Sequence, residues 1–137
     1  MNSSNNVVTL AGRILMSAIF IFAAIGKISA FQGTVAYAAS AHVPMPQVAI
    51  AVAIAVELLG GIAILAGFQT RIAAWIVFLY LIPTSIFFHN FWAMEGMARM
   101  NNQIHFLKNV AIMGGLLILA ANGAGGASID ASRASKS

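Results

Sequence analysis

The sequence has no cysteine and very little charge, and each absence excludes a class of protein. Among its 137 residues there are seven Lys or Arg and three Asp or Glu, so charged residues make up only 7%. Soluble domains carry about a quarter charged residues, and a soluble chain of this length would lack the charge to cover its surface. Without cysteine the chain cannot form disulfides, thiol redox pairs or iron–sulfur clusters.

Basic residues outnumber acidic ones, and the formal net charge is +4. They are scattered singly at the ends of apolar runs and inside them, with no basic patch interleaved with aromatic residues. Nucleic-acid binding is therefore not expected. Because 61% of the residues are hydrophobic, the composition predicts a membrane protein whose first partner is the lipid bilayer.

Four apolar runs are long enough to cross a bilayer, which takes about 20 residues of helix. They cover residues 7–26, 47–67, 72–88 and 104–122, and their continuous apolar character predicts helices rather than strands. The first run is better read as an uncleaved helix than as a signal peptide, since its first basic residue, Arg13, lies inside the run. The chain is predicted to be a single all-α domain, a four-transmembrane-helix bundle.

The connections between the spans differ in length and character. The first connection is long, and its mildly amphipathic residues 34–39 predict a short helix at the membrane interface. Residues 123–137 are rich in Gly, Ala and Ser, which predicts a flexible tail. Four spans place both termini on one side of the membrane. A small excess of basic residues there favours the cytoplasm.

Glu57 lies in the middle of the second span, where a charge costs on the order of a few kcal/mol. It must be protonated, paired or facing a wet cavity. Arg13 and Lys108 are the candidate partners, because each lies one to two turns inside a span. Gly60 and Gly61 share its helix face and would let a neighbouring helix or a flat ligand approach. Two interpretations stay open: a carboxyl in a proton path or ligand site, or a structural ion pair.

A second group of polar residues belongs to one end of the predicted bundle. Its members are Lys27, Tyr37, His89, His105, Lys108 and Asn109. Such side chains can donate hydrogen bonds to quinone carbonyls at headgroup depth, or can simply cap helices and contact lipid phosphates. One histidine pair is too little to indicate haem. No metal is expected either, because neither carboxylate nor cysteine accompanies the histidines at ligand spacing.

An ordered set of short motifs over nearly the whole chain resembles the DoxX family of small four-helix bacterial inner-membrane proteins. The pieces are Gly12-Arg13-Ile14-Leu15, Ile25-Gly26-Lys27, Glu57-Leu58-Leu59-Gly60-Gly61, Gly67-Phe68-Gln69-Thr70-Arg71, Phe88-His89-Asn90-Phe91-Trp92 and Phe106-Leu107-Lys108-Asn109. The resemblance implies the four-span fold and a place in the bacterial cytoplasmic membrane. The family is named for a subunit of a thiosulfate:quinone oxidoreductase, and another member is linked to redox-stress defence, but fold alone does not deliver function.

The resemblance suggests a quinone-linked oxidoreductase subunit or accessory in redox or sulfur metabolism or oxidative-stress defence. Glu57, Lys108 and His89 are the predicted catalytic residues, with Glu57 carrying protons. The predicted ligand-binding residues are Arg13, Lys27, Tyr37, Gly61, Arg71, Trp92, His105 and Asn109. Electrons would come from a bound cofactor or a redox partner protein, and a homo-oligomer is possible. The alternative is a non-enzymatic binding, transport or assembly protein that holds a lipid-like ligand or a partner.

Overall fold

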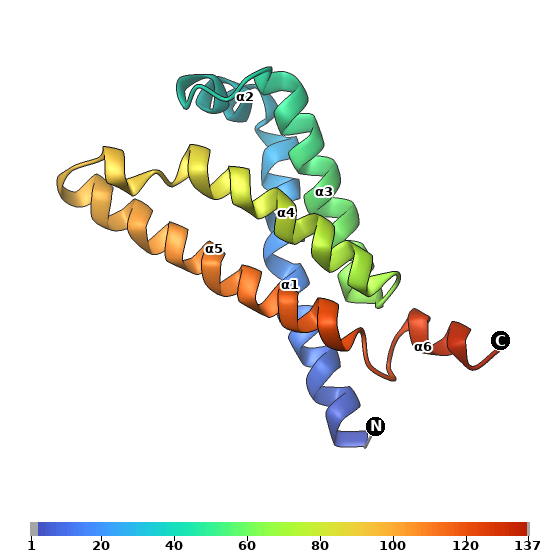
Figure 1. The fold of residues 1–137 in the computed structure, drawn as a ribbon. Helices are drawn as coiled ribbons and strands as arrows, with labels where there is room; N and C mark the ends of the chain where they lie inside the picture. Colours follow the sequence, from blue (N-terminus) through green and yellow to red (C-terminus); the bar gives the residue numbers. More distant parts are fainter. Residues whose placement is uncertain (1–2, 137) are drawn as a thin grey trace.

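Four long helices make up most of the chain in the computed structural model, which describes residues 3–136 (Figure 1). They are α1 (Ser3–Ser29), α3 (Pro46–Ala66), α4 (Thr70–Phe88) and α5 (Gly96–Asn122). Three short helices connect or follow them: α2 (Phe31–Ser40), η1 (Phe91–Ala93) and α6 (Ile129–Ala134). Each long helix is long and apolar enough to span a membrane, which confirms the four-span, all-α prediction.

The first and last long helices extend further than the apolar runs that predicted them. Helix α5 begins at Gly96 instead of near residue 104, and its first two turns are largely polar or exposed. At 1.5 Å per residue, its 27 residues measure about 40 Å, which exceeds the hydrocarbon thickness of about 30 Å. An apolar run marks the part of a helix inside the bilayer, whereas the hydrogen-bonded helix continues beyond it.

Helix α3 is the shared element of the bundle because two adjacent glycines admit a neighbour on each side. A Cβ added to Gly61 would lie 3.0 Å from Ile21 Cγ1 of α1, and one added to Gly60 would lie 2.6 Å from Val77 Cγ2 of α4. Small residues allow such close helix approach in membranes. The sequence predicted that Gly60 and Gly61 would admit either a neighbouring helix or a flat ligand, and the structure shows a neighbouring helix at each glycine.

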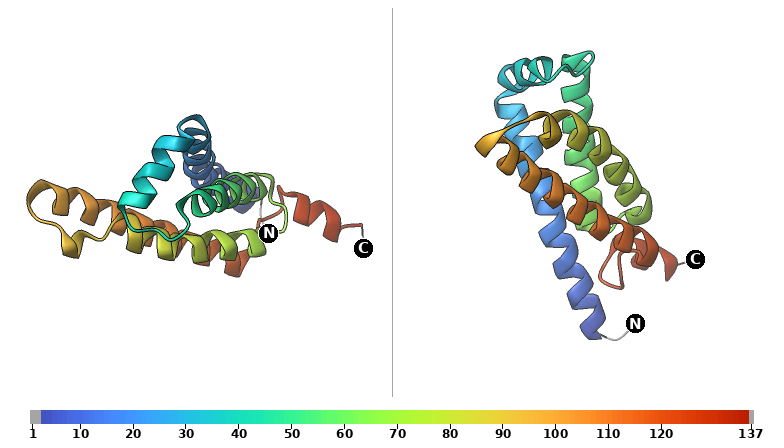
Figure 2. Two further views of the ribbon diagram at one scale, coloured as in Figure 1. Left: turned by 90° about the horizontal axis from the view of Figure 1, so that it is seen from above. Right: turned by 60° about the vertical axis from the view of Figure 1, so that its left-hand side comes forward.

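The helices form two pairs that cross each other. Helix α1 packs along α3, while α4 and α5 lie side by side as a hairpin that crosses the first pair obliquely (Figure 1, Figure 2). The core where they meet includes Phe20, Ile64, Ala74, Val77 and Leu116. Helix α2 lies across the ends of α1 and α3, in the connection where the sequence predicted a short helix (Figure 1).

The C-terminal residues are tied to the bundle, although their composition predicts a loose tail. The amide of Asp130 donates to the Gly67 carbonyl at 2.9 Å. Its carboxylate accepts the backbone N–H groups of Gln69 at 2.7 Å and Thr70 at 3.0 Å, and so caps the N-terminus of α4. Both termini lie at this end of the bundle (Figure 1). We call the segment 123–136 with these contacts the clasp.

Candidate functional site

Glu57 is only 5% exposed, and three hydrogen bonds satisfy its carboxylate. The Lys27 ammonium donates to Oε1 at 2.9 Å and to Oε2 at 2.8 Å. The Tyr80 hydroxyl donates to Oε1 at 2.7 Å. The partner of the intramembrane carboxyl is therefore Lys27 from the end of α1, and the prediction that it would be Arg13 or Lys108 is wrong.

The reason for that error is the length and direction of α1. The apolar run ends at residue 26, so the sequence assigned Lys27 to the membrane surface. In the structure α1 continues to Ser29 and packs along α3, which leaves the long Lys27 side chain within reach of Glu57. The long aliphatic stem of Lys27 lets its ammonium reach inward to this buried carboxylate. Lys108, by contrast, is exposed on α5.

Tyr80 is the member of this cluster that the sequence reasoning missed. It lies on α4, and its hydroxyl completes the hydrogen bonding of Glu57. A tyrosine hydroxyl inside a membrane span needs a partner, as a buried tyrosine generally does. The sequence did carry a signal for this role, because Tyr80 lies in the middle of the third apolar run and the preceding span contains a glutamate.

A cavity of about 450 Å³ adjoins this cluster, enclosed mainly by α2, α3 and α4. Its lining is mostly apolar, and its volume is that of sites for small molecules, roughly 300–1,000 Å³. The polar residues in the wall are Lys27, Thr34, Tyr37, Tyr80, Thr84 and His89. Glu57 is not among the described residues that line the cavity. Its carboxylate is connected to the cavity through its hydrogen bonds with Lys27 and Tyr80, which do line it.

An aromatic contact between two helices forms part of the cavity wall. Tyr37 of α2 stacks on Phe88 at the end of α4, with ring centroids 5.5 Å apart and an interplanar angle of 25°. Both rings also line the cavity. Helix α2 is thereby held against α4, and a flat ligand in the cavity would have aromatic faces beside it.

The predicted polar group at this end of the bundle divides into two. Lys27, Tyr37 and His89 line the cavity. His105 lies outside the lining and stacks on His89, with centroids 5.2 Å apart and Asn102 Oδ1 3.2 Å from His89 Nδ1. Asn109 donates to Ser85 Oγ at 3.0 Å. Within residues 3–136 no group of three or more His, Cys, Asp or Glu side chains is placed to hold a metal ion.

Two predicted ligand-binding arginines lie at the other end of the bundle and contact backbone instead. Arg13 is 1% exposed and donates to the carbonyls of Leu65, at 3.4 Å, and Ala127. Arg71 donates to the Ala120 carbonyl at 3.2 Å. Leu65 and Ala120 lie in the last turns of α3 and α5, where carbonyls lack helical partners and the helix dipole attracts cations.

Two further predicted ligand-binding residues lie outside the cavity lining. Gly61 packs against α1, as described above. Trp92 is 55% exposed and makes edge contacts with Phe91 and Phe106, at centroid distances of 5.3 and 5.8 Å. The aromatic group around Trp92 belongs to the turn between α4 and α5.

The arrangement of Lys27, Glu57 and Tyr80 couples one titratable carboxyl to the cavity wall. Lys27 and Glu57 together are neutral when both are charged. If Glu57 takes up a proton, the Lys27 charge is left without its partner and can stabilise negative charge on a group in the cavity. Tyr80, which touches both the cavity and the carboxylate, can pass that proton.

Comparison with known proteins identifies relatives of this chain. The DoxX family model matches residues 8–90. The chain is 40% identical over 124 residues to inner membrane protein YphA of Escherichia coli strain K12, covering 90% of this chain and 89% of that protein. It is also 40% identical over 133 residues to inner membrane protein YqjF of the same strain, covering 95% of each. No solved structure matches. The family match contains Lys27, Glu57 and Tyr80.

Proposed function

The chain belongs to the DoxX family of membrane proteins, and on that premise we propose that it is a quinone-binding subunit or accessory of an oxidoreductase in the bacterial cytoplasmic membrane. Its context would be redox or sulfur metabolism or oxidative-stress defence. The observation that carries the proposal is the buried Lys27–Glu57–Tyr80 cluster beside a largely apolar cavity of about 450 Å³.

The residues around the cavity fit a quinone headgroup in chemistry and in size. A quinone is flat and apolar apart from two carbonyl oxygens, which accept hydrogen bonds. The wall offers the third N–H of the Lys27 ammonium as a donor, and the stacked rings of Tyr37 and Phe88 as a flat apolar surface. The Tyr80 hydroxyl donates to Glu57, and it becomes free to donate toward the cavity when Glu57 is protonated. When bound, a quinone supplies two-electron, two-proton redox chemistry.

The protein's own residues would move the proton and balance the charge. When Glu57 is protonated, it can donate to the Tyr80 oxygen while the Tyr80 hydroxyl donates toward the cavity, so that one proton leaves Glu57 and the carboxylate paired with Lys27 is restored. Lys27 holds the carboxylate in place from the other side through two hydrogen bonds. His89, at the C-terminal end of α4, is a second proton donor in the same wall.

The electrons must come from elsewhere than cysteine chemistry, because the chain has no cysteine. We place the donor on a partner redox protein or on a cofactor that the partner carries. Both termini and the clasp lie at the end of the bundle opposite α2 (Figure 1). The cavity is lined in part by α2, so a partner that delivers electrons to it would approach the α2 end.

One observation favours the alternative of a non-enzymatic protein that binds or transports a lipid-like ligand. Lys27, Tyr80 and Glu57 already satisfy one another, so their hydrogen bonding does not require a ligand. The cavity would then select its occupant by apolar shape alone. The two proposals differ in whether the protein turns over quinone with proton exchange at Glu57 or only binds its ligand.

Filling the cavity tests the proposal with a matched pair of variants. Val52 and Val48 both lie on α3 and are each 52% exposed, and of the two only Val52 lines the cavity. We expect Val52→Trp to lower the quinone that copurifies with the protein, or the affinity for added short-chain ubiquinone, by about tenfold. Val48→Trp should retain both. Absence of quinone binding in the wild-type protein, or equal binding by the two variants, would refute the site.

A second pair tests the proton role. Glu57→Gln keeps an oxygen that can accept from Lys27 and Tyr80 but cannot carry a proton. We expect it to slow quinone-dependent turnover by about a hundredfold, the usual contribution of a positioned acid or base. Glu95→Gln changes an exposed glutamate outside the cluster and should be silent. Unchanged turnover in Glu57→Gln would refute the proton role of Glu57, and quinone binding without any turnover in the wild-type protein would favour the non-enzymatic alternative.

A further inference from the structure

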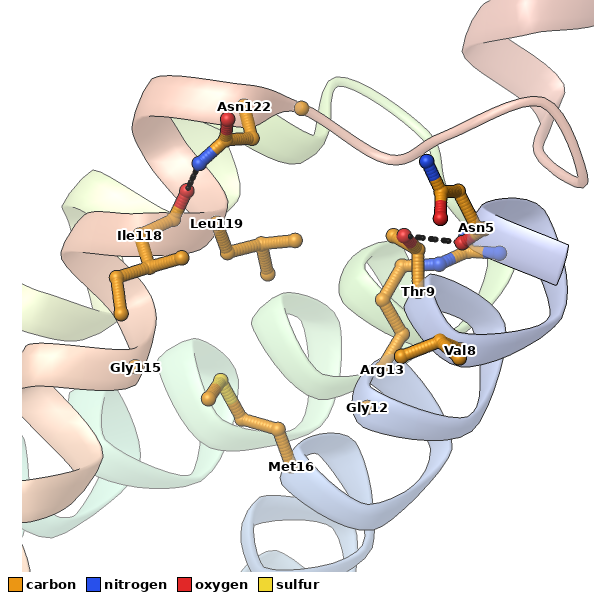
Figure 3. Close-up of a pocket in the computed structure, with 11 residues that line it drawn as sticks. Asn5, Val8, Thr9, Gly12, Arg13, Met16, Gly115, Ile118, Leu119 and Asn122 are labelled. Carbon is orange, nitrogen blue, oxygen red and sulfur yellow. Dashed lines mark hydrogen bonds between the residues drawn. The ribbon is translucent and has the colours of Figure 1, made fainter. Parts of the chain in front are cut away.

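A second cavity, of about 410 Å³, lies between α1 and α5 near the end of the bundle that carries the termini (Figure 3). Helix α1 packs mainly on α3, and α5 mainly on α4, so these two helices leave a gap where they pass each other. The gap is open at Gly12 on the α1 side, where a Cβ added to the glycine would meet no atom within 4 Å. None of the reactions proposed above uses this groove.

The lining of the groove changes from polar to apolar along its length. Asn5 and Thr9 of α1 and Asn122 of α5 lie at the end nearer the helix termini, whereas Met16 lies deeper along α1 (Figure 3). Ile118 and Leu119 supply apolar surface from the α5 side. A lipid molecule at a membrane surface has this order of polarity, with its headgroup outward and its acyl chain inward.

The charged side chain in the lining of the groove is that of Arg13, which is positive. Arg13 lines it and is 1% exposed, and its Nε is a buried donor without a hydrogen-bond partner among residues 3–136. Its partners, the Leu65 and Ala127 carbonyls, carry no net charge. The carboxylate of Asp130, on the clasp, acts on Arg13 through space, but it accepts the amides of Gln69 and Thr70 and does not line the groove. Within the described part of the chain, no Asp or Glu lines the groove, so its polar end favours an anion.

We propose that this groove binds one phospholipid with an anionic headgroup. The phosphate would lie at the polar end, among Asn5, Thr9 and Asn122 and within the field of Arg13, and an acyl chain would pass over Gly12 toward Met16. The proposal is independent of the quinone cavity, which lies at the other end of the bundle. Anionic lipids supply the membrane surface with negative charge that basic side chains recognise.

Native mass spectrometry and thermal unfolding of the purified protein test the proposal. Phosphatidylglycerol, phosphatidylcholine and inorganic phosphate are added separately to the protein in detergent. We expect phosphatidylglycerol to bind with 1:1 stoichiometry and to raise the unfolding temperature. Its apparent affinity should exceed that of phosphatidylcholine by about tenfold, and inorganic phosphate should have no such effect.

Gly12→Leu closes the groove and should abolish this selective binding. Gly114→Leu is the matched control, because Gly114 is also an exposed helical glycine with no atom within 4 Å of an added Cβ, and it does not line the groove. Ile118→Trp narrows the groove from α5 and should reproduce the loss if Gly12→Leu does not fold. Equal binding of both lipids, an equal effect of inorganic phosphate, or retained selectivity in the groove variants would overturn the proposal.

Discussion

The two ends of the bundle deal with buried charge in different ways. At the α2 end, Lys27 pairs with Glu57, and Tyr80 donates a hydrogen bond to the same carboxylate beside a cavity. At the end that carries the termini, Arg13, Arg71 and Asp130 bind backbone groups at helix ends. The first arrangement joins two titratable groups, whereas the second satisfies fixed dipoles of the fold.

This difference helps to tell a structural charge from a functional candidate. A charge bound to a helix terminus stabilises that terminus without needing a second ionisable group. A buried pair of side chains costs desolvation that apolar residues would avoid, so it contributes little stability of its own. We therefore look for chemistry at the α2 end and for fold stabilisation in the clasp, and four substitutions test that division.

Breaking the buried pair should have the largest effect. Lys27→Met leaves the Glu57 carboxylate, 5% exposed, without its cation. We expect it to lower the free energy of unfolding by about 3 kcal/mol, measured by denaturation in detergent micelles. The double variant Lys27→Met with Glu57→Gln removes both charges and should lose less than the single variant. A double variant that loses the sum of both effects would mean that the pair is not coupled.

Removing the buried arginine at the opposite end should come next. Arg13→Gln gives up the charge-assisted hydrogen bonds to Leu65 and Ala127 and should cost about 2 kcal/mol. It should also raise hydrogen exchange of the amides in the clasp, while the Tyr37–Phe88 contact at the other end stays unchanged. Exchange that rises equally at both ends would contradict the separation of the two regions.

The carboxylate of the clasp gives a dependence on pH. Burial alone would raise the pKa of Asp130, but the backbone N–H groups of Thr70 and Gln69, with the Arg133 charge, lower that pKa below its ordinary 3.8. A depressed pKa means that the stabilisation is complete above the unfolded-state value. It is lost as the pH falls through the lower folded-state value. Asp130→Asn should cost about 1 kcal/mol at neutral pH and flatten this acid limb of the stability curve.

The exposed arginine in the first turn of α4 should matter least. Arg71→Ala removes one hydrogen bond to the Ala120 carbonyl from an exposed side chain, and we expect a loss of about 0.5 kcal/mol. Salt should reduce the difference in free energy of unfolding between the wild type and Arg71→Ala, because the arginine interacts with a helix terminus near water. A loss larger than that of Arg13→Gln would reverse the proposed order of the two arginines.

The sequence predicts the fold well because hydrophobic length in a bilayer is a strong constraint. The four apolar runs and the short helix between the first two are all observed. The polar extension of α5 and the helix α6 were not predicted, since neither is marked by hydrophobic length. The capping role of Asp130 depends on an approach of residues 60 apart in the chain, which composition cannot reveal.

The site was predictable in its central residue and less so in its partners. The cost of a charge in mid-membrane identified Glu57 from the sequence. Which cation reaches it depends on how α1 lies along α3, and this made Lys27 rather than Arg13 the partner. Tyr80 was overlooked because one hydroxyl among apolar residues carries a weak signal until its neighbour is known.

The bond between Arg13 and the Ala127 carbonyl joins residues 114 positions apart. During synthesis, therefore, α1 enters the membrane long before the ribosome has made the oxygen that receives its guanidinium. In that interval the nascent helix must carry an arginine that only water, lipid phosphate or the translocation machinery can accommodate. Closure of the clasp over Arg13 therefore comes after the synthesis of all four long helices.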